Sequence, residues 1–340
     1  MDANGADLGA AEVAEGAALA TAGGTRVLLF GPADRIGTVP DGVTVVNAPV
    51  SIAKAPDPAM AVRSAPEASI VQAARAVADG RADALVSGGS TGAAIAAGVF
   101  RIRRARGIHR PALAVPIPVR GGHVLLLDVG ASAEARPEHL VQFAFMGAAF
   151  AHAVLGVNRP RVALLSNGAE PGRGTPALIS AHERLAAAGT GSEAMRFEGN
   201  VEGTDFLAGA VDVVVTDGFT GNVALKTVEG VSQTVVGAIR DAATASVRGR
   251  VGGLLLRAGL RRFRDEIDPE RAGGAYLLGL RRVGVVAHGR FSRTGFARAI
   301  AVAERGVREQ VVERTQTALE AAGALRRSSS EPPISVSARS

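Results

Sequence analysis

The chain has 340 residues, of which 47% are hydrophobic and only 4% aromatic, and it carries a formal net charge of +6. It contains no Cys, which excludes disulfides, thiolate nucleophiles and Cys-ligated metals. No segment combines a basic start, an apolar run and a cleavage site, and no apolar stretch reaches spanning length, so we expect a cytoplasmic protein.

Short apolar segments typical of buried strands recur along the chain and alternate with Ala-rich segments of helical spacing. The strand-like segments cover residues 25–31, 42–48, 82–89, 111–119, 123–130, 160–168, 211–218 and 281–289, and the clearest helical segments cover 67–82 and 137–156. Such runs are typical of parallel strands that are covered on both faces. The alternation predicts an α/β fold with helices on both faces of a mostly parallel sheet.

The two ends of the chain and one internal segment depart from this pattern. Residues 1–20 read as a loop followed by a helix, with no strand before it. Residues 248–270 contain no strand and mix a short Leu run with Arg. We therefore predict one α/β domain over residues 1–325, interrupted by a helical segment at 248–270. The Ser- and Pro-rich tail, 326–340, is predicted to be disordered.

Four strand-to-helix junctions are rich in glycine and side-chain hydroxyls. In a parallel sheet such junctions lie at one edge, where backbone N–H groups and helix N-termini bind anions. The residues concerned are Ser87, Gly88, Gly89, Ser90, Thr91 and Gly92 in the first junction, Asp128 and Ser132 in the second, Gly168 and Arg173 in the third, and Asp217, Thr220, Gly221 and Asn222 in the fourth. A tight strand-to-helix turn explains the first junction equally well, and Pro137 after the second junction is a common helix start.

Two further residues could reach the same edge. Lys226 follows Asn222 by one helical turn, although a solvated helix lysine explains it as well, and His288 ends a predicted strand. The sequence has no nucleophile elbow, no phosphate-binding P-loop, no dinucleotide fingerprint and no His pair at metal-ligand spacing. An enzyme of this kind must orient two substrates and stabilise developing charge.

The basic residues are clustered. The clusters are Arg101, Arg103, Arg104 and Arg106; Arg257, Arg261, Arg262 and Arg264; and Arg281 and Arg282. Because no aromatic residues are interleaved with the first cluster, nucleic-acid binding is disfavoured. An acidic protein partner or an anionic membrane surface fits these clusters better.

The order of these motifs resembles the bacterial phosphate acyltransferases of the PlsX type. The resemblance rests on "SGGSTGA", "DVGAS…RPEHL", "LLSNGAEPGRGT", "FEGNVEG", "DGFTGNVALKTVEG" and "VVAHGRF", and it covers nearly the whole chain apart from both ends. It implies a three-layer α/β/α sandwich related to isocitrate dehydrogenase, a homodimer, and neither metal nor cofactor. The implied reaction transfers a fatty acyl group from acyl carrier protein to inorganic phosphate, giving acyl phosphate for phospholipid synthesis.

By the same resemblance, Asn222 and Arg173 are the catalytic candidates, and the other junction residues, Lys226 and His288 bind substrate or phosphate. Arg173 stands where the family usually has Lys, and Ser90 and Ser132 stand where it usually has Asn. Arg does not exchange a proton near neutral pH, and a hydroxyl donates one hydrogen bond where an amide donates two. Two alternatives therefore stay open: transfer from acyl-CoA or of an unusual acyl group, and a catalytically weak homologue that scaffolds lipid synthesis.

The segment 248–270 has the composition of an amphipathic membrane-surface element. Its residues for this contact are Leu254, Leu255, Leu256, Arg257, Leu260, Arg261, Arg262 and Phe263. The resemblance implies peripheral membrane association and contact with a glycerol-3-phosphate acyltransferase. A helix at a dimer interface is the alternative explanation.

Overall fold

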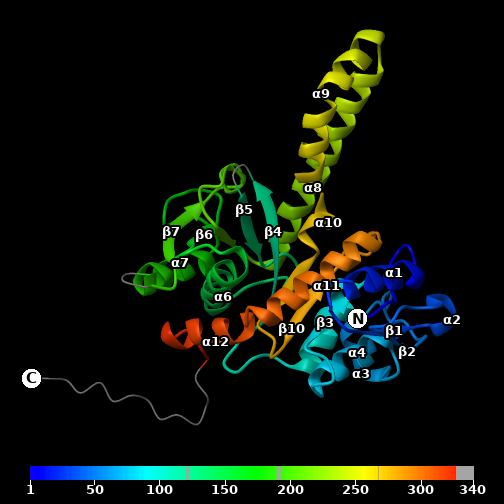
Figure 1. Ribbon diagram of the computed structural model, residues 1–340. Coiled ribbons are helices and arrows are strands. Elements are labelled where there is room, and N and C mark those ends of the chain that lie inside the picture. The colour runs from blue at the N-terminus through cyan, green and yellow to red at the C-terminus, as the bar shows by residue number, and fades with distance from the viewer. Residues whose placement is uncertain (120–121, 190–192, 267, 327–340) are drawn as a thin grey trace, which may run out of the picture.

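The computed structural model describes residues 1–119, 122–189, 193–266 and 268–326 (Figure 1). The predicted disordered tail beyond Arg326 lies outside the described residues. The strands are β1 (Val27–Gly31), β2 (Val43–Asn47), β3 (Ala84–Ser87), β4 (Ala112–Val119), β5 (Gly122–Leu127), β6 (Arg161–Leu165), β7 (Arg196–Val201), β8 (Val213–Val215), β9 (Ala275–Leu278) and β10 (Val283–Val286). All eight predicted strand segments are confirmed, whereas β7 and β9 were not predicted.

The helices lie between and after these strands. They are α1 (Ala10–Thr21), α2 (Ala33–Ile36), α3 (Pro58–Ser64), α4 (Ser69–Ala78), α5 (Thr91–Ala97), the π-helical turn η1 (Gly98–Ile102), α6 (Pro137–Leu155), α7 (Pro176–Gly189), the 3-10 turn η2 (Phe206–Ala208), α8 (Gly218–Thr244), α9 (Val247–Glu266), α10 (Pro269–Ala272), α11 (Arg293–Arg308) and α12 (Val311–Ala321). Pro137 does open α6, as predicted.

Eight strands form one sheet in the order β3-β10-β9-β4-β5-β8-β6-β7, and β1 pairs with β2 beside it. Most neighbouring strands are parallel, but β9 is antiparallel to both β10 and β4, and β4 is antiparallel to β5. Strands β1, β2, β3, β10 and β4 therefore run one way, and β9, β5, β8, β6 and β7 run the other.

The first residues of the chain join the β1–β2 pair to the eight-stranded sheet, which corrects the expectation that no strand-like segment precedes α1. Asp2 forms parallel bridges to Phe30 and Ser87, so residues 1–3 fill the gap between β1 and β3. The backbone N–H groups of Asp2 and Ala3 donate to Val86 and Phe30, at 2.9 Å each. This pairing depends on segments about 30 and 85 residues away and leaves no local sequence signal.

Helices cover both faces of the sheet, so the molecule has the predicted three layers. On β5, Leu125 and Leu127 face one core and Val124 and Leu126 face the other, as alternation along a strand requires. Helices α1, α6, α7, α11 and α12 cover the first core, and α3, α4, α5 and the base of α8 cover the second (Figure 1).

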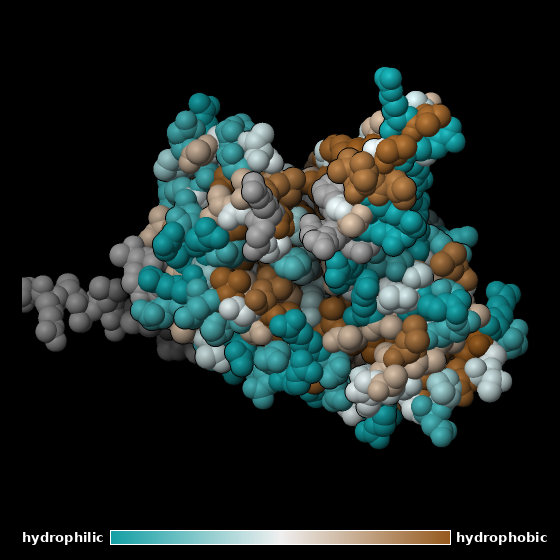
Figure 2. Space-filling view, turned by 45° about the horizontal axis from the view of Figure 1, so that its top comes forward, coloured by the Kyte–Doolittle hydropathy of each residue, from teal (hydrophilic) through white to brown (hydrophobic). Residues whose placement is uncertain are grey.

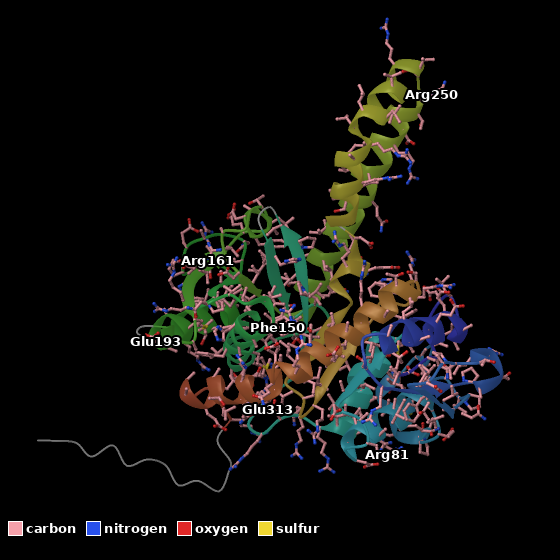
Figure 3. The ribbon with its side chains drawn as sticks, in the orientation of Figure 1. Arg81, Phe150, Arg161, Glu193, Arg250 and Glu313 are labelled. Atoms are coloured by element: carbon pink, nitrogen blue, oxygen red, sulfur yellow. The ribbon has the colours of Figure 1, made fainter. Side chains whose placement is uncertain are left out.

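Helices α8 and α9 pack against each other and project from the body as a helical hairpin (Figure 1). Arg250 lies near its tip (Figure 3). At 27 residues, α8 is about 40 Å long, which exceeds what is needed to cross back over the sheet. The predicted protruding helical segment is thus confirmed, and it begins well before residue 248. Among the described residues, no helix is both long and apolar enough to cross a membrane.

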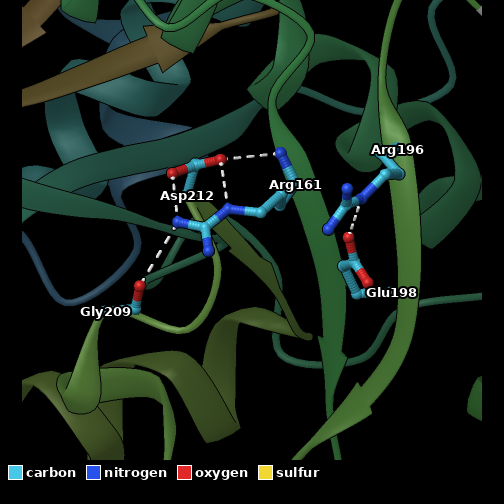
Figure 4. A network of polar contacts seen from close by, with 5 residues as sticks. All are labelled: Arg161, Arg196, Glu198, Gly209 and Asp212. Atoms are coloured by element: carbon cyan, nitrogen blue, oxygen red, sulfur yellow. Dashed lines mark hydrogen bonds and ion pairs between the residues drawn. The ribbon is translucent and has the colours of Figure 1, made fainter.

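An arginine–carboxylate pair fastens the amino ends of two central strands (Figure 4). Arg161, at the start of β6, donates to Asp212 through its backbone N, its Nε and its Nη2, at 2.7, 3.0 and 2.8 Å. Burial alone would raise the pKa of Asp212, but these bonds hold it below its usual value. The pair sits at the end of these strands opposite the junctions discussed next.

Candidate functional site

Three of the four predicted junctions meet at one edge of the sheet. They follow β5, β8 and β6, which are parallel neighbours, so their carboxyl ends lie side by side. The first junction follows β3, which runs in the opposite direction, and therefore lies at the other end of the strands. The expectation of a single shared edge is wrong for Ser87–Gly92 and for His288 after β10.

Asp128 organises the loop after β5. Its side chain is fully buried and accepts hydrogen bonds from the backbone N atoms of Leu113, Gly130, Ala131 and Ser132 at 2.8–3.1 Å, and from the Ser132 hydroxyl at 2.8 Å. Burial raises the pKa of Asp128, while these donors oppose the rise. Both carboxylate oxygens are occupied, so Asp128 and Ser132 shape the loop and offer no free group to an anion.

This loop is interlocked with the first turn of α8. A Cβ on Gly218 would lie 2.2 Å from the carbonyl oxygen of Ser132, and one on Gly221 would lie 1.9 Å from that of Asp128. Only glycine permits such an approach between a helix and a neighbouring backbone. The two glycines therefore place the N-terminus of α8 directly against the β5 loop.

The polar side chains at the start of α8 are engaged in a helix cap or an ion pair, except for Asn222. Asp217 caps α8 by accepting from the backbone N and the hydroxyl of Thr220, at 2.9 and 2.7 Å. Lys226 pairs with Glu229 at 3.3 Å. Asn222 is exposed, and within the described part of the chain no hydrogen bond engages its side-chain amide. Asn222 is thus the side chain of this turn that remains available to a ligand.

The loop after β6 presents a cation at the same edge. Arg173 is exposed, and its Nε lies 3.4 Å from Glu170, itself exposed. A Cβ on Gly168 would lie 2.7 Å from the Arg173 Cγ, so this glycine makes room for the arginine side chain. An exposed pair of this kind is weak, which leaves the Arg173 guanidinium able to exchange Glu170 for an anionic ligand.

Two residues that sequence reasoning missed hold this loop in place. Asn200, on the unpredicted strand β7, donates to the Glu170 carbonyl oxygen at 2.8 Å, and its Oδ1 lies 3.0 Å from His182 Nδ1 on α7. Both side chains are buried. The motif "FEGNVEG" was part of the resemblance, but without β7 it gave no hint that Asn200 faces the Glu170 loop.

The first junction instead belongs to a separate polar cluster with the N-terminal residues. Ser69 donates to Asp2 at 2.6 Å and Ser87 donates to it at 3.4 Å, while the Asn4 amide donates to Ser69 at 3.0 Å. Burial raises the pKa of Asp2 to about 6, although hydrogen bonds from Ser69 and Asn4 act against this. The cluster lines a small hollow.

The remaining residues of this end make local contacts. Ser90 caps α5 by accepting from the backbone N of Ala93 at 3.3 Å, and Gly89 passes so close to Gly5 that no side chain fits. Thr91 is exposed, and Gly92 packs near Pro58. His288 is exposed and its Nδ1 accepts from the backbone N of Arg290 at 3.2 Å. These contacts account for Ser90, Gly89 and His288 without a ligand.

At the β5–β8–β6 edge, the arrangement can bind an anion and stabilise negative charge. It offers the amide of Asn222, the guanidinium of Arg173 and a helix N-terminus within one set of adjacent loops. In the described part of the chain, no cluster of His, Asp and Glu has the arrangement of a metal site.

Comparisons with known proteins show the family to which the chain is similar. The model of the family described as "Fatty acid synthesis protein" matches residues 1–314. A phosphate acyltransferase of Desulforudis audaxviator is 41% identical over 316 residues, covering 92% of this chain and 93% of the relative. One from Lacticaseibacillus casei is 46% identical over 249 residues, covering 73% and 72%.

Solved structures show the same fold at low sequence identity. The EutD phosphotransacetylase from Staphylococcus aureus superposes with a TM-score of 0.58 at 16% identity, covering 90% of this chain and 93% of that one. A branched-chain phosphotransacylase from Enterococcus faecalis gives 0.55 at 15% identity, covering 90% and 98%. At these identities the likeness extends to the fold alone.

Proposed function

Because the chain belongs to the fatty acid synthesis protein family, whose relatives above are phosphate acyltransferases, we propose that it transfers a fatty acyl group from acyl carrier protein to inorganic phosphate. The acyl phosphate product would serve phospholipid synthesis. Asn222 is the observation that carries the proposal: it is an exposed amide in the second turn of a helix whose N-terminus is locked against the Asp128 loop.

The reaction needs no nucleophile from the protein. A phosphate oxygen attacks the thioester carbonyl carbon, the carbonyl oxygen becomes an oxyanion, and the carbon–sulfur bond then breaks to release the carrier thiolate, which takes up a proton. We assign the Asn222 amide to the oxyanion or to a phosphate oxygen, and the Arg173 guanidinium to two phosphate oxygens. Both roles amount to positioning and charge stabilisation, which suits a site with no activated nucleophile.

The test is acyl phosphate formation from a long-chain acyl carrier protein and phosphate, comparing the parent with Asn222→Ala. Removing one donor to a developing oxyanion costs roughly 10²- to 10³-fold in rate, and because the side chain is exposed we expect unchanged thermal stability. Thr227→Ala, farther along α8, is the matched control and should retain activity. Full activity in Asn222→Ala would refute the assignment.

The two alternatives predict different results in the same assay. A parent that forms acyl phosphate from acyl-CoA and not from acyl carrier protein has a different donor. A parent that is inactive with both donors, but gains turnover on Arg173→Lys, is a weakened homologue. The lysine restores a group that can lose a proton when its pKa is lowered.

We also propose that the α8–α9 hairpin contacts an anionic membrane, a second copy of the chain, or both. Its exposed apolar side chains include Leu254, Leu255 and Leu256 at 68%, 80% and 64% exposure, and the space-filling view shows apolar surface gathered on the hairpin (Figure 2). Arg257 and Arg261 are exposed beside them; the side chains of Leu260, Arg262 and Phe263 lie outside the described residues. Apolar residues flanked by arginines are the composition of a membrane-surface helix.

A further inference from the structure

We propose that an arginine-rich surface next to the candidate site is the docking surface for an acidic protein. The surface consists of Arg103, Arg104, Arg106, Arg110, Arg281, Arg282 and Arg326, all exposed. This inference rests on the proposed function: the protein that binds the surface is the carrier of the acyl group, and its carboxylates contact the arginines.

Three segments far apart in the sequence build this surface, and backbone hydrogen bonds fasten them together. The backbone N of Arg281 donates to the Arg103 carbonyl oxygen at 3.0 Å, and that of Ala105 donates to Gly279 at 2.9 Å. The backbone N of Arg326 donates to Gly107 at 2.8 Å. The arginines are therefore held in a fixed array by the tertiary structure.

The positive charge of this surface is left uncompensated within the described residues. None of its arginines forms an ion pair there; the Arg104 side chain donates to the His109 carbonyl oxygen and that of Arg281 donates to the Arg104 carbonyl oxygen. Burial, with Arg326, Arg104 and Arg136, lowers the pKa of His109, and Glu138 is the carboxylate that opposes them. An array of like charges is unfavourable for the isolated fold and favours an anionic partner.

The strained backbone of Arg103 also supports a functional role for this surface. It follows the π-helical turn η1 and has φ 74° and ψ 158°, a conformation that is rare for any residue with a side chain. Such a conformation is unfavourable for a residue with a side chain and is found preferentially at functional sites. The charge cluster and the strain are independent features of the same loop.

The surface lies at the edge of the sheet that carries the candidate site. Arg110 precedes Leu113 by three residues, so at most about 11 Å of chain separates the two. The backbone N of Leu113 in turn donates a hydrogen bond to Asp128 in the loop after β5. The turn between β9 and β10 lies at this same end, because Leu278 pairs with Ala112. A carrier bound to these arginines would thus hold its acyl group beside the loops that bear Asn222 and Arg173.

The experiment compares the parent with the double variant Arg106→Glu/Arg282→Glu, two exposed arginines whose side chains form no hydrogen bond or ion pair in the described chain. Arg35→Glu/Arg81→Glu is the control, because it makes the same charge change at exposed arginines elsewhere (Arg81 is labelled in Figure 3). Binding of acyl carrier protein is measured directly, and KM and kcat are measured for carrier and phosphate.

We expect the Arg106/Arg282 variant to raise the Kd and KM for the carrier at least tenfold, with kcat and the KM for phosphate unchanged. The parent should lose carrier affinity with added salt, and the control should behave as the parent. Equal carrier affinity in parent and variant would overturn the inference, as would a fall in kcat at saturating carrier. Loss of binding to anionic vesicles or RNA, with carrier binding intact, would assign the surface to another partner and overturn it too.

Failure of the proposed function gives a different result. If the parent binds the carrier and the double variant does not, but no acyl phosphate forms, the docking surface stands and the reaction is wrong. If acyl phosphate forms at equal carrier KM in parent and variant, the reaction stands and the docking surface is wrong.

Discussion

Gly221 lies so close to the backbone of Asp128 that a Cβ at this position would be 1.9 Å from the Asp128 carbonyl oxygen. The first turn of α8 and the loop after β5 are therefore packed against each other through their backbones. The position of Asn222, one residue later, follows from this contact.

Gly221→Ala should therefore lower both activity and stability. The methyl group cannot be accommodated by rotating a side chain, because its neighbour is backbone, so we expect a loss of about 1–3 kcal/mol in unfolding free energy and a large fall in acyl phosphate formation. Gly230→Ala is the matched control: the same helix has open space there, and alanine should stabilise it by up to about 1 kcal/mol. Urea unfolding measures both; equal stability in the two variants would contradict the expectation.

Asp128→Asn should disorganise the β5 loop. An amide nitrogen would face the backbone N and the hydroxyl of Ser132, two donors that now bond to the carboxylate. An unsatisfied buried donor costs about 1–3 kcal/mol. Asp57→Asn, at the exposed N-cap of α3, is the control, because Asn caps helices as well as Asp. Unfolding midpoints that shift equally in both variants would show that Asp128 is an ordinary cap.

Asp2 should make stability depend on pH, because burial raises its pKa from 3.8 to about 6. Between these values the folded protein retains a proton that the unfolded chain has released, so the contribution of Asp2 is full below pH 3.8 and falls as the pH rises to about 6. The loss is on the order of 3 kcal/mol. Asp2→Asn keeps an oxygen for Ser69 and Asn4 and should remove this dependence. Parallel curves of unfolding free energy against pH for parent and variant would argue against it.

Leu255→Asp should weaken binding to anionic vesicles in a flotation assay. Leu255 is 80% exposed on the projecting hairpin, and a carboxylate there loses apolar contact and is repelled by the lipid headgroups. Leu19→Asp, at a position 51% exposed on α1, is the control and should float as the parent does. Unchanged flotation of Leu255→Asp would leave the dimer contact as the role of this face, which sedimentation of the same variant would then test.

Features that depend on contiguous residues were determined by the sequence itself. Apolar runs specified eight of the strands, and Pro137 marked the start of α6. The motif order predicted the three-layer fold and the family. Local patterns suffice here because strand burial, helix capping and turn chemistry act within a few residues.

The tertiary structure alone decided which of these parts meet. Strand direction depends on pairing between distant segments. Three successive antiparallel pairings, β10–β9, β9–β4 and β4–β5, make β3 and β10 run opposite to β5, so Ser87 and His288 lie away from the edge that bears Asn222. The same pairing puts Asp2 beside Ser87 and brings Arg106 and Arg282 onto one surface. Such contacts join segments that are far apart in the sequence and depend on how the whole sheet packs, so no single stretch of sequence predicts them.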